Sequence, residues 1–236
     1  KVKKAAIVVP DEEALFDKHI EAPLSLPPIV DVECVDELID GLNVIAKMKL
    51  GRSETIVHIV CDSVVNFTGD AIVNAANEGC LGGGGIDGEI NRRGGLAKVR
   101  EELPILEGSG WGQIRCHTGN AVMTIAGALP CKFVIHAVGP KFGYCEETHA
   151  TDLDLLKNAY INAIRRAEEK GLKSVGFCLL SAGIFRGSCP LKQVIEVGLD
   201  AITEYASSLD KIFLCAFTGE EKKTIREIVN EKDPSR

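Results

Sequence analysis

The chain has 236 residues, of which 45% are hydrophobic and 26% are charged. These proportions are those of a soluble globular protein, and the length predicts one large domain or one domain with an appendage. Acidic residues outnumber basic ones by 34 to 27, which gives a formal net charge of −7. A negative net charge argues against a protein that binds nucleic acid or an anionic membrane through its overall charge. Any anionic ligand must therefore be bound by local groups.

The cysteines indicate a reducing compartment. Their number, nine, is odd, and none forms a Cys-x-x-Cys pair or has a histidine partner at zinc-binding spacing. No apolar run approaches the roughly 20 residues of a membrane span, and no signal-peptide pattern is present. We expect reduced thiols, no metal, no cofactor, no membrane association, a monomer, and an intracellular location, either cytoplasmic or nuclear.

The first 50 residues predict a helical extension. A short helix is expected at residues 11–20, before a segment broken by prolines. A longer helix is expected after it, because apolar residues recur at intervals of three and four. These residues are Val32, Val35, Leu38, Ile39, Leu42, Ile45 and Met48. The expected boundaries are 1–50 for the helical extension, 51–232 for the main domain and 233–236 for a frayed tail.

After residue 50, short segments rich in Val and Ile alternate with amphipathic segments. Strands are expected at 55–60, 71–75, 121–126, 133–137, 174–180 and 211–216. Helices are expected at 88–94, 96–103, 153–170, 191–207 and 220–230. This alternation indicates an α/β fold with three layers, α/β/α, around a central mixed, largely parallel sheet. In such sheets, ligands bind at the carboxyl ends of the strands.

Four consecutive glycines, Gly82 to Gly85, follow the strand expected at 71–75 and open into a helix. Consecutive glycines expose backbone N–H groups and adopt positive φ, so the loop can curl around an anion at the positive end of the helix. This context favours a diphosphate ligand, although a flexible turn has the same composition. The Walker pattern and the spaced Gly-x-Gly-x-x-Gly pattern are both missing, which argues against a P-loop or Rossmann site.

Five sequence motifs, taken in their order and spacing, support a more specific interpretation. They are Asn74-Ala-Ala-Asn77, Leu81-Gly-Gly-Gly-Gly-Ile-Asp-Gly88, Gly119-Asn-Ala, the segment 129–140 and Leu180-Ser-Ala-Gly-Ile-Phe185. On these elements the sequence resembles the macrodomain family, whose modules bind ADP-ribose. The second element is most similar to the MacroD-type branch, whose members hydrolyse mono-ADP-ribose and deacetylate O-acetyl-ADP-ribose. The last element also resembles viral-type macrodomains, so the branch stays open.

The resemblance implies the residues that bind ADP-ribose. Asp62 would accept a hydrogen bond from the adenine amino group, assisted by the backbone of Ser63, although a turn or helix cap also explains an aspartate here. Asn77 would bind the distal ribose hydroxyls, unless its amide bonds its own loop. The other implied contacts are Asn74, whose role is more structural, then Gly82, Gly83, Gly84, Gly85 and Ile86, and in a second loop Ser181, Ala182, Gly183, Ile184 and Phe185.

The resemblance also implies catalysis by Asp87, together with Asn77. Cleavage at the anomeric carbon passes through a state with oxocarbenium character. An ionised carboxylate can deprotonate a water and stabilise the developing cation. Asp87 stands directly before Gly88, however, so it is also well placed to cap the following helix.

The function expected from this sequence is hydrolysis of mono-ADP-ribose from acidic side chains, deacetylation of O-acetyl-ADP-ribose, or both. Its partners would be ADP-ribose and ADP-ribosylated proteins, and nucleic acid is not an expected partner. A non-catalytic reader of ADP-ribosylated proteins is the alternative, because binding and hydrolysis use almost the same pocket. An unrelated nucleotide-phosphate enzyme is a more distant alternative.

Overall fold

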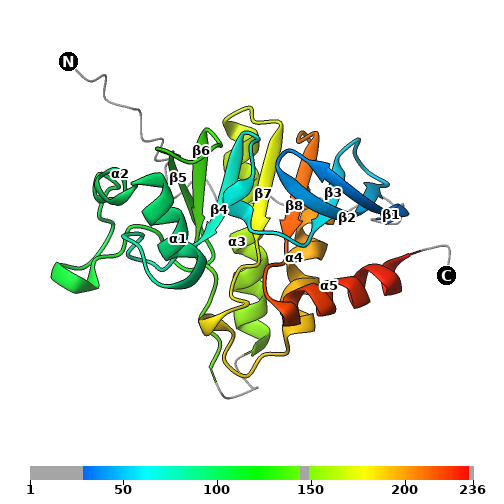
Figure 1. Cartoon of the computed structure of the whole chain (residues 1–236). Coiled ribbons are helices and arrows are strands. Elements are labelled where there is room, and N and C mark those ends of the chain that lie inside the picture. The colour runs from blue at the N-terminus through cyan, green and yellow to red at the C-terminus, as the bar shows by residue number, and fades with distance from the viewer. Residues whose placement is uncertain (1–28, 144–148, 234–236) are drawn as a thin grey trace.

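One eight-stranded sheet runs through the middle of the molecule (Figure 1). It is seen in a computed structural model that describes residues 29–143 and 149–233. The strands are β1 Ile29–Ile39, β2 Leu42–Leu50, β3 Ile56–Val60, β4 Ala71–Ala75, β5 Ala121–Ile125, β6 Phe133–Ala137, β7 Ser174–Cys178 and β8 Lys211–Cys215. Their order is β1-β2-β3-β8-β7-β4-β6-β5. From β3 to β6 in this order neighbouring strands are parallel, and the pairs at both edges are antiparallel.

Helices cover both faces of this sheet. They are α1 Gly85–Gly94, α2 Ala97–Glu101, α3 His149–Glu169, α4 Leu191–Tyr205 and α5 Gly219–Lys232, with short 3₁₀ helices at Val64–Asn66, Gly110–Gly112 and Ile184–Arg186. In Figure 1, α1 and α2 lie in front of the β4, β6 and β5 end, and α3 and α4 lie behind the middle of the sheet. The predicted three-layer α/β/α arrangement is confirmed. Each strand and helix predicted after residue 50 is present with small shifts at its ends.

The central strands are apolar on both faces because helices bury both faces. In β8, for example, Ile212, Phe213 and Leu214 are fully buried. Buried side chains from the strands and from the inner sides of α3 and α4 form one continuous core. Among the described residues, no helix is long and apolar enough to cross a membrane.

The helix predicted from Val32 to Met48 is wrong. These residues form β1 and β2, an antiparallel hairpin that turns at Asp40 and Gly41, both with positive φ (48° and 82°). Side chains in β2 alternate between buried and partly exposed positions, with a buried Leu42 at the start and Leu50 at the end. The short helix predicted at residues 11–20 lies outside the described residues.

The hairpin is part of the main sheet. Strand β2 pairs with β3 through registers such as Met48 with Val57, and Met48 is fully buried in the common core. The boundary predicted between residues 50 and 51 therefore falls between two hydrogen-bonded neighbouring strands.

Candidate functional site

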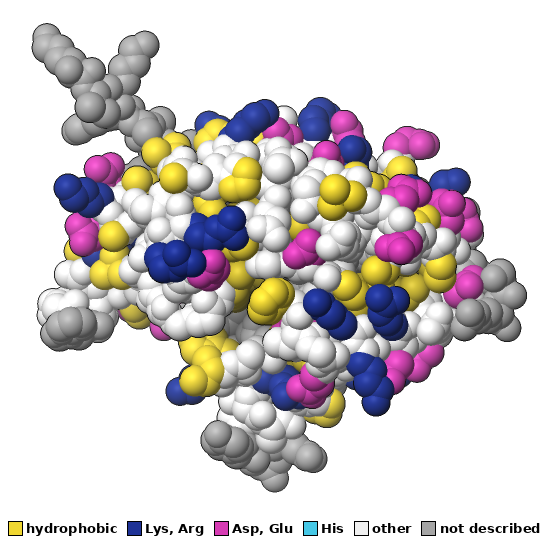
Figure 2. All heavy atoms as spheres, in the orientation of Figure 1, with side chains coloured by type: hydrophobic (Ala, Val, Ile, Leu, Met, Phe, Trp, Pro, Cys, Tyr) yellow, Lys and Arg dark blue, Asp and Glu magenta, His cyan; other side chains and the backbone are white. Residues whose placement is uncertain are grey.

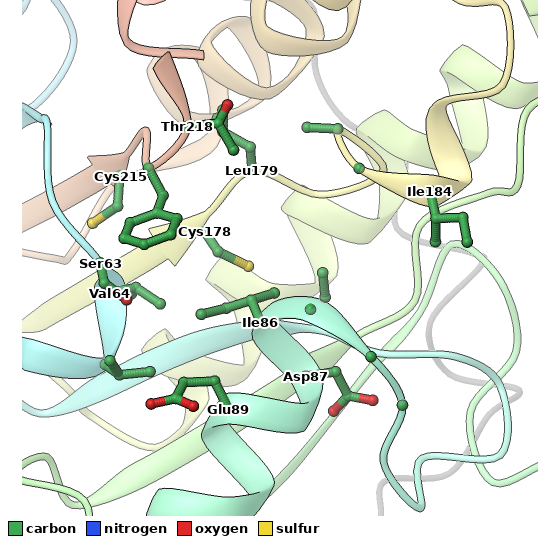
Figure 3. Close-up of a pocket in the computed structure, with 18 of the residues that line it drawn as sticks. Ser63, Val64, Ile86, Asp87, Glu89, Cys178, Leu179, Ile184, Cys215 and Thr218 are labelled. Carbon is green, nitrogen blue, oxygen red and sulfur yellow. The ribbon is translucent and has the colours of Figure 1, made fainter. Parts of the chain in front are cut away.

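A cavity of about 930 Å³ opens at the carboxyl ends of β3, β4, β7 and β8 (Figure 3). The loop that follows each of these strands lines part of it. Parallel strands present all their carboxyl ends at one edge of a sheet, so four loops that are distant in sequence meet there. This volume suits a ligand of the size of a small cofactor.

Most of the residues predicted for the site line this cavity. They are Asp62, Ser63, Asn77, Gly83, Gly84, Gly85, Ile86, Asp87, Ser181, Ala182, Gly183, Ile184 and Phe185. In Figure 3, Ser63 and Val64 lie at one end, Ile184 and Asp87 lie toward the other, and Ile86 lies between them. The structure does not place Asn74 or Gly82 on the cavity wall.

The glycine loop leads into α1 without any side-chain cap. The N-cap residue is Gly84, and no side chain among the described residues accepts a hydrogen bond from the first turn. Gly82 and Gly85 have φ values of 112° and 58°, which other residues rarely adopt. The uncapped helix end therefore presents free N–H groups and a positive dipole at the cavity, which is the arrangement that favours an anionic ligand.

The second loop follows β7 and contributes backbone and an exposed side chain. Ser181 has a φ of 52°, and its hydroxyl donates a hydrogen bond to the carbonyl of Pro140 at 2.7 Å. The Ser181 side chain is therefore committed to the fold. Ile184 is 91% exposed, and the neighbouring Arg186 forms an ion pair with Glu220 at the start of α5, with Nη1 and Oε1 3.3 Å apart.

Asp62 stands at the other end of the cavity and is held by three donors. Its Oδ1 accepts from the backbone N–H of Ser63 at 2.6 Å and from Nδ2 of Asn66 at 3.3 Å. Its Oδ2 accepts from Nδ2 of Asn43, in β2, at 3.1 Å. Phe217, an aromatic residue with 64% of its surface exposed, lines the same cavity from the loop after β8.

Asp87 lies in the first turn of α1 and does not cap it, so the capping interpretation of this residue is wrong. The helix begins three residues earlier than predicted, which turns the Asp87 side chain inward. Its Oδ1 accepts from Nη1 of Arg100 at 2.6 Å and from Nδ2 of Asn74 at 2.7 Å. The side chain of Arg100 is completely buried and that of Asp87 is 4% exposed.

The second carboxylate oxygen of Asp87 is placed differently. Oδ2 lies beside Gly83, because a Cβ built on Gly83 would stand 3.2 Å from it. It accepts no hydrogen bond from any residue that the structure describes. Asp87 therefore has one oxygen that is bound by the protein and one that is open to a ligand or a water.

Asn74 was included among the implied ligand contacts with a mainly structural role, and the structure agrees with the structural role and not with the contact. It is fully buried beneath the cavity, where its amide joins Asp87 to the ring of His136, with Nδ2 and Nδ1 3.0 Å apart. Asn77 does line the cavity, but it also holds the glycine loop together. Its Nδ2 donates to the carbonyl of Gly82, and its Oδ1 accepts from the backbone N–H of Cys80, both at 3.1 Å.

Two cysteines on the cavity wall are unsuited to nucleophilic catalysis. Burial raises the pKa of the Cys178 thiol to about 12, and burial also raises that of Cys215 well above its usual value. Both thiols are therefore protonated at neutral pH, whereas the nucleophilic form of cysteine is the thiolate.

Sequence reasoning missed Phe217, Asn43 and Arg100. Phe217 follows a parallel strand just as the glycine loop does, so its position in the chain could have signalled it. Arg100 lies four residues after Leu96 and three before Leu103, on the buried side of α2. A charged residue between two buried leucines at helical spacing is an available signal, because unpaired charges are rarely buried.

Comparison with known proteins finds similar sequences and similar folds. The family model described as Macro domain matches residues 73–197. The O-acetyl-ADP-ribose deacetylase of Escherichia fergusonii is 37% identical over 167 residues, which cover 67% of this chain and 87% of that protein.

Two solved structures have the same fold. The Oceanobacillus iheyensis macrodomain with ADP superposes with a TM-score of 0.66 at 27% identity, covering 78% of this chain and 97% of that one. The Trypanosoma brucei macrodomain in complex with ADP-ribose has a TM-score of 0.60 at 29% identity, covering 77% and 78%. The glycine loop, the fold and these matches agree, and the chain belongs to the Macro domain family.

Proposed function

We propose that this protein binds ADP-ribose and hydrolyses ester-type bonds at its distal ribose. The binding part rests on the cavity, which offers suitable groups to the adenine and to the diphosphate of ADP-ribose. Asp62 and the exposed ring of Phe217 suit the amino group and the face of adenine. The uncapped start of α1 suits the diphosphate.

Binding through backbone N–H groups fits the charge of the protein. On the face shown in Figure 2, basic and acidic side chains are interspersed, and the net charge is −7. A compact diphosphate needs only a few oriented N–H groups, whereas a long polyanion needs an extended basic surface. The site therefore favours a nucleoside diphosphate over nucleic acid.

The observation that carries the hydrolytic part is the asymmetric environment of Asp87. With Oδ1 held by two donors, Oδ2 is left to accept a proton from a water. For O-acetyl-ADP-ribose, the oxygen of that water attacks the acetyl carbon, and the bond between this carbon and the ribose oxygen breaks. The ribose oxygen takes up a proton, and acetate and ADP-ribose are released.

The same group serves a protein substrate linked through Glu or Asp. Water attacks the anomeric carbon, the bond to the side-chain oxygen breaks, and the carboxylate leaves with the electron pair. Deacetylation is supported by the name of the Escherichia fergusonii relative. Hydrolysis of mono-ADP-ribosylated proteins is the further part of the proposal, since it needs the same water and the same carboxylate.

A release assay with the wild-type protein tests this function. We expect acetate from O-acetyl-ADP-ribose and free ADP-ribose from a protein modified on Glu or Asp, with calorimetric binding of ADP-ribose measured alongside. Binding without either release would replace the hydrolase with a reader of ADP-ribosylated proteins. Tighter binding of another nucleotide than of ADP-ribose would contradict both functions.

A further inference from the structure

We propose that Arg100 is a positioning residue for Asp87, which fixes Oδ1 toward the protein interior and leaves Oδ2 facing the cavity. This inference rests on the proposed hydrolytic function. Arg100 lies on α2 and does not line the cavity, so it influences the reaction through the residues that it contacts and does not touch the ligand itself.

The contacts of Arg100 lock its guanidinium in place. Nε donates to the backbone carbonyl of Cys80, and Nη1 donates to Oδ1 of Asp87 at 2.6 Å. Cys80 ends the turn that Asn77 holds, just before the glycine loop. One guanidinium therefore fixes both the backbone entering the glycine loop and the carboxylate that follows it. The planar fork of arginine makes such a double contact possible, whereas a lysine ammonium has no second group in a fixed direction.

Packing alone does not explain an arginine at this position. The leucines that flank α2 on its buried side, Leu96 and Leu103, are buried apolar residues. Buried ion pairs are weak stabilisers, because the loss of hydration offsets the attraction. The pair is also incomplete, since Nη2 is buried without a partner among the described residues. An aliphatic side chain would suit the core at this point. We therefore attribute the charged side chain of Arg100 to its role in orienting the carboxylate of Asp87.

A second contact fixes the carboxylate from the other side. Asn74 donates from Nδ2 to Oδ1 of Asp87, which sets the orientation of its amide because a carboxylate only accepts. The same Nδ2 faces Nδ1 of His136, whose Nε2 lies 2.9 Å from Oγ1 of Thr124. Burial, together with the charge of Arg100, lowers the pKa of His136 well below its usual value.

His136 is therefore neutral, and the chain of hydrogen bonds has one direction. Nε2–H of His136 donates to Thr124, and Nδ1 of His136 accepts from Asn74. Asn74 and Arg100 together supply two donors to a single oxygen of Asp87. Rotation of the carboxylate would break both contacts, so Oδ2 stays on the side of Gly83 and the cavity.

Kinetics of Arg100→Met, Arg100→Gln and Arg100→Lys on O-acetyl-ADP-ribose test this role. We expect kcat to fall at least tenfold in Arg100→Met, while KM and the Kd for ADP-ribose change less than about threefold. Arg100→Lys should recover part of kcat, and Arg100→Gln should recover less.

Arg166→Met is the matched control, because Arg166 is a buried arginine on α3 whose partners, Ala121 and Glu169, lie outside the cavity. If Arg100→Met does not fold, the kcat, KM and Kd of Arg100→Gln and Arg100→Lys are compared with those of the wild type instead. An unchanged kcat in folded Arg100 variants, or a loss of kcat that follows the loss of ADP-ribose affinity, would overturn the positioning role alone. A wild-type protein without turnover would overturn the proposed function, and the positioning role with it.

Discussion

Asn43 donates a hydrogen bond from Nδ2 to Oδ2 of Asp62 at 3.1 Å. This contact links the N-terminal hairpin to the end of the cavity that suits adenine. The backbone repeats the link, since the N–H of Cys61 donates to the carbonyl of Asn43 at 3.1 Å. The hairpin therefore contributes to the shape of the site and is more than an additional pair of strands at the edge of the sheet.

Removal of this contact should weaken ligand binding. Without Asn43, Oδ2 of Asp62 loses a donor that orients it, so we expect Asn43→Ala to raise the Kd for ADP-ribose a few-fold. That corresponds to about 1 kcal/mol, which is typical of one hydrogen bond. Lys49→Ala is the control, since Lys49 lies on the same strand and forms an ion pair with Asp31 at the surface. Equal affinities of the two variants in calorimetry would show that Asn43 does not act on the ligand.

The sequence did not reveal this hairpin because its apolar residues satisfy two patterns. Val32, Val35 and Leu38 have helical spacing, but β1 is an edge strand with largely exposed side chains, so it lacks a clear alternation. The Asp40-Gly41 pair is a strong hairpin signal when apolar segments flank it on both sides. Pairing of β2 with β3 decides the structure, and it is a non-local interaction that local spacing does not report.

The loops of the site were more predictable than its buried support. A glycine run or an aspartate after a strand reports the end of that strand directly, which placed Asp62 and Asp87 at the correct edge of the sheet. The partners beneath the cavity come from separate elements, since Arg100 is on α2 and His136 is on β6. Their meeting depends on how α2 packs against the sheet, and the sequence of either element alone does not specify it.

Gly88 is required by the glycine loop and not by the helix that contains it. A Cβ on Gly88 would stand 2.6 Å from the carbonyl oxygen of Gly83, so Gly88→Ala must displace the loop. We expect at least a tenfold loss of ADP-ribose affinity, although alanine is the better helix former by about 1 kcal/mol. Gly219→Ala is the matched control, because a Cβ there meets no atom within 4 Å. Wild-type affinity in Gly88→Ala would contradict this account of the loop.

Asp87→Asn should separate turnover from binding. The amide keeps an oxygen that can accept from Arg100 and Asn74, but it cannot take a proton from water. We expect kcat on O-acetyl-ADP-ribose to fall at least tenfold, which is about 1.4 kcal/mol in the barrier. The Kd for ADP-ribose should stay within about threefold in calorimetry. Full turnover by the folded variant would remove Asp87 from the mechanism.

His136 should make stability depend on pH. Its pKa is lowered by burial in the folded state, whereas in the unfolded chain it is about 6.5. Between these two values the unfolded state binds more protons, so stability falls as the pH drops below about 6.5, by up to about 1.4 kcal/mol per pH unit. Urea unfolding between pH 7 and pH 5 should show a shallower decline for His136→Gln than for the wild type. Burial also lowers the pKa of His58. Because His58 is present in both proteins, its contribution cancels when the two slopes are compared. Identical slopes would contradict the neutral state of His136.

Asp87→Ala is a different test from Asp87→Asn, because it leaves the charge of Arg100 buried and unpaired. Breaking a buried ion pair from one side costs about 3–5 kcal/mol, so the alanine variant should lose much of the stability of the protein. Adding Arg100→Met removes the stranded charge, and the double variant should be more stable than Asp87→Ala alone.

Urea unfolding of the wild type, both single variants and the double variant gives the coupling energy between the two residues. We expect about 2 kcal/mol or more, while the double variant remains inactive on O-acetyl-ADP-ribose. Restored stability without restored turnover would separate the structural effect of Asp87 from its chemical one. Additive losses, with no coupling between the residues, would show that the 2.6 Å contact between Arg100 and Asp87 does not hold the carboxylate in solution.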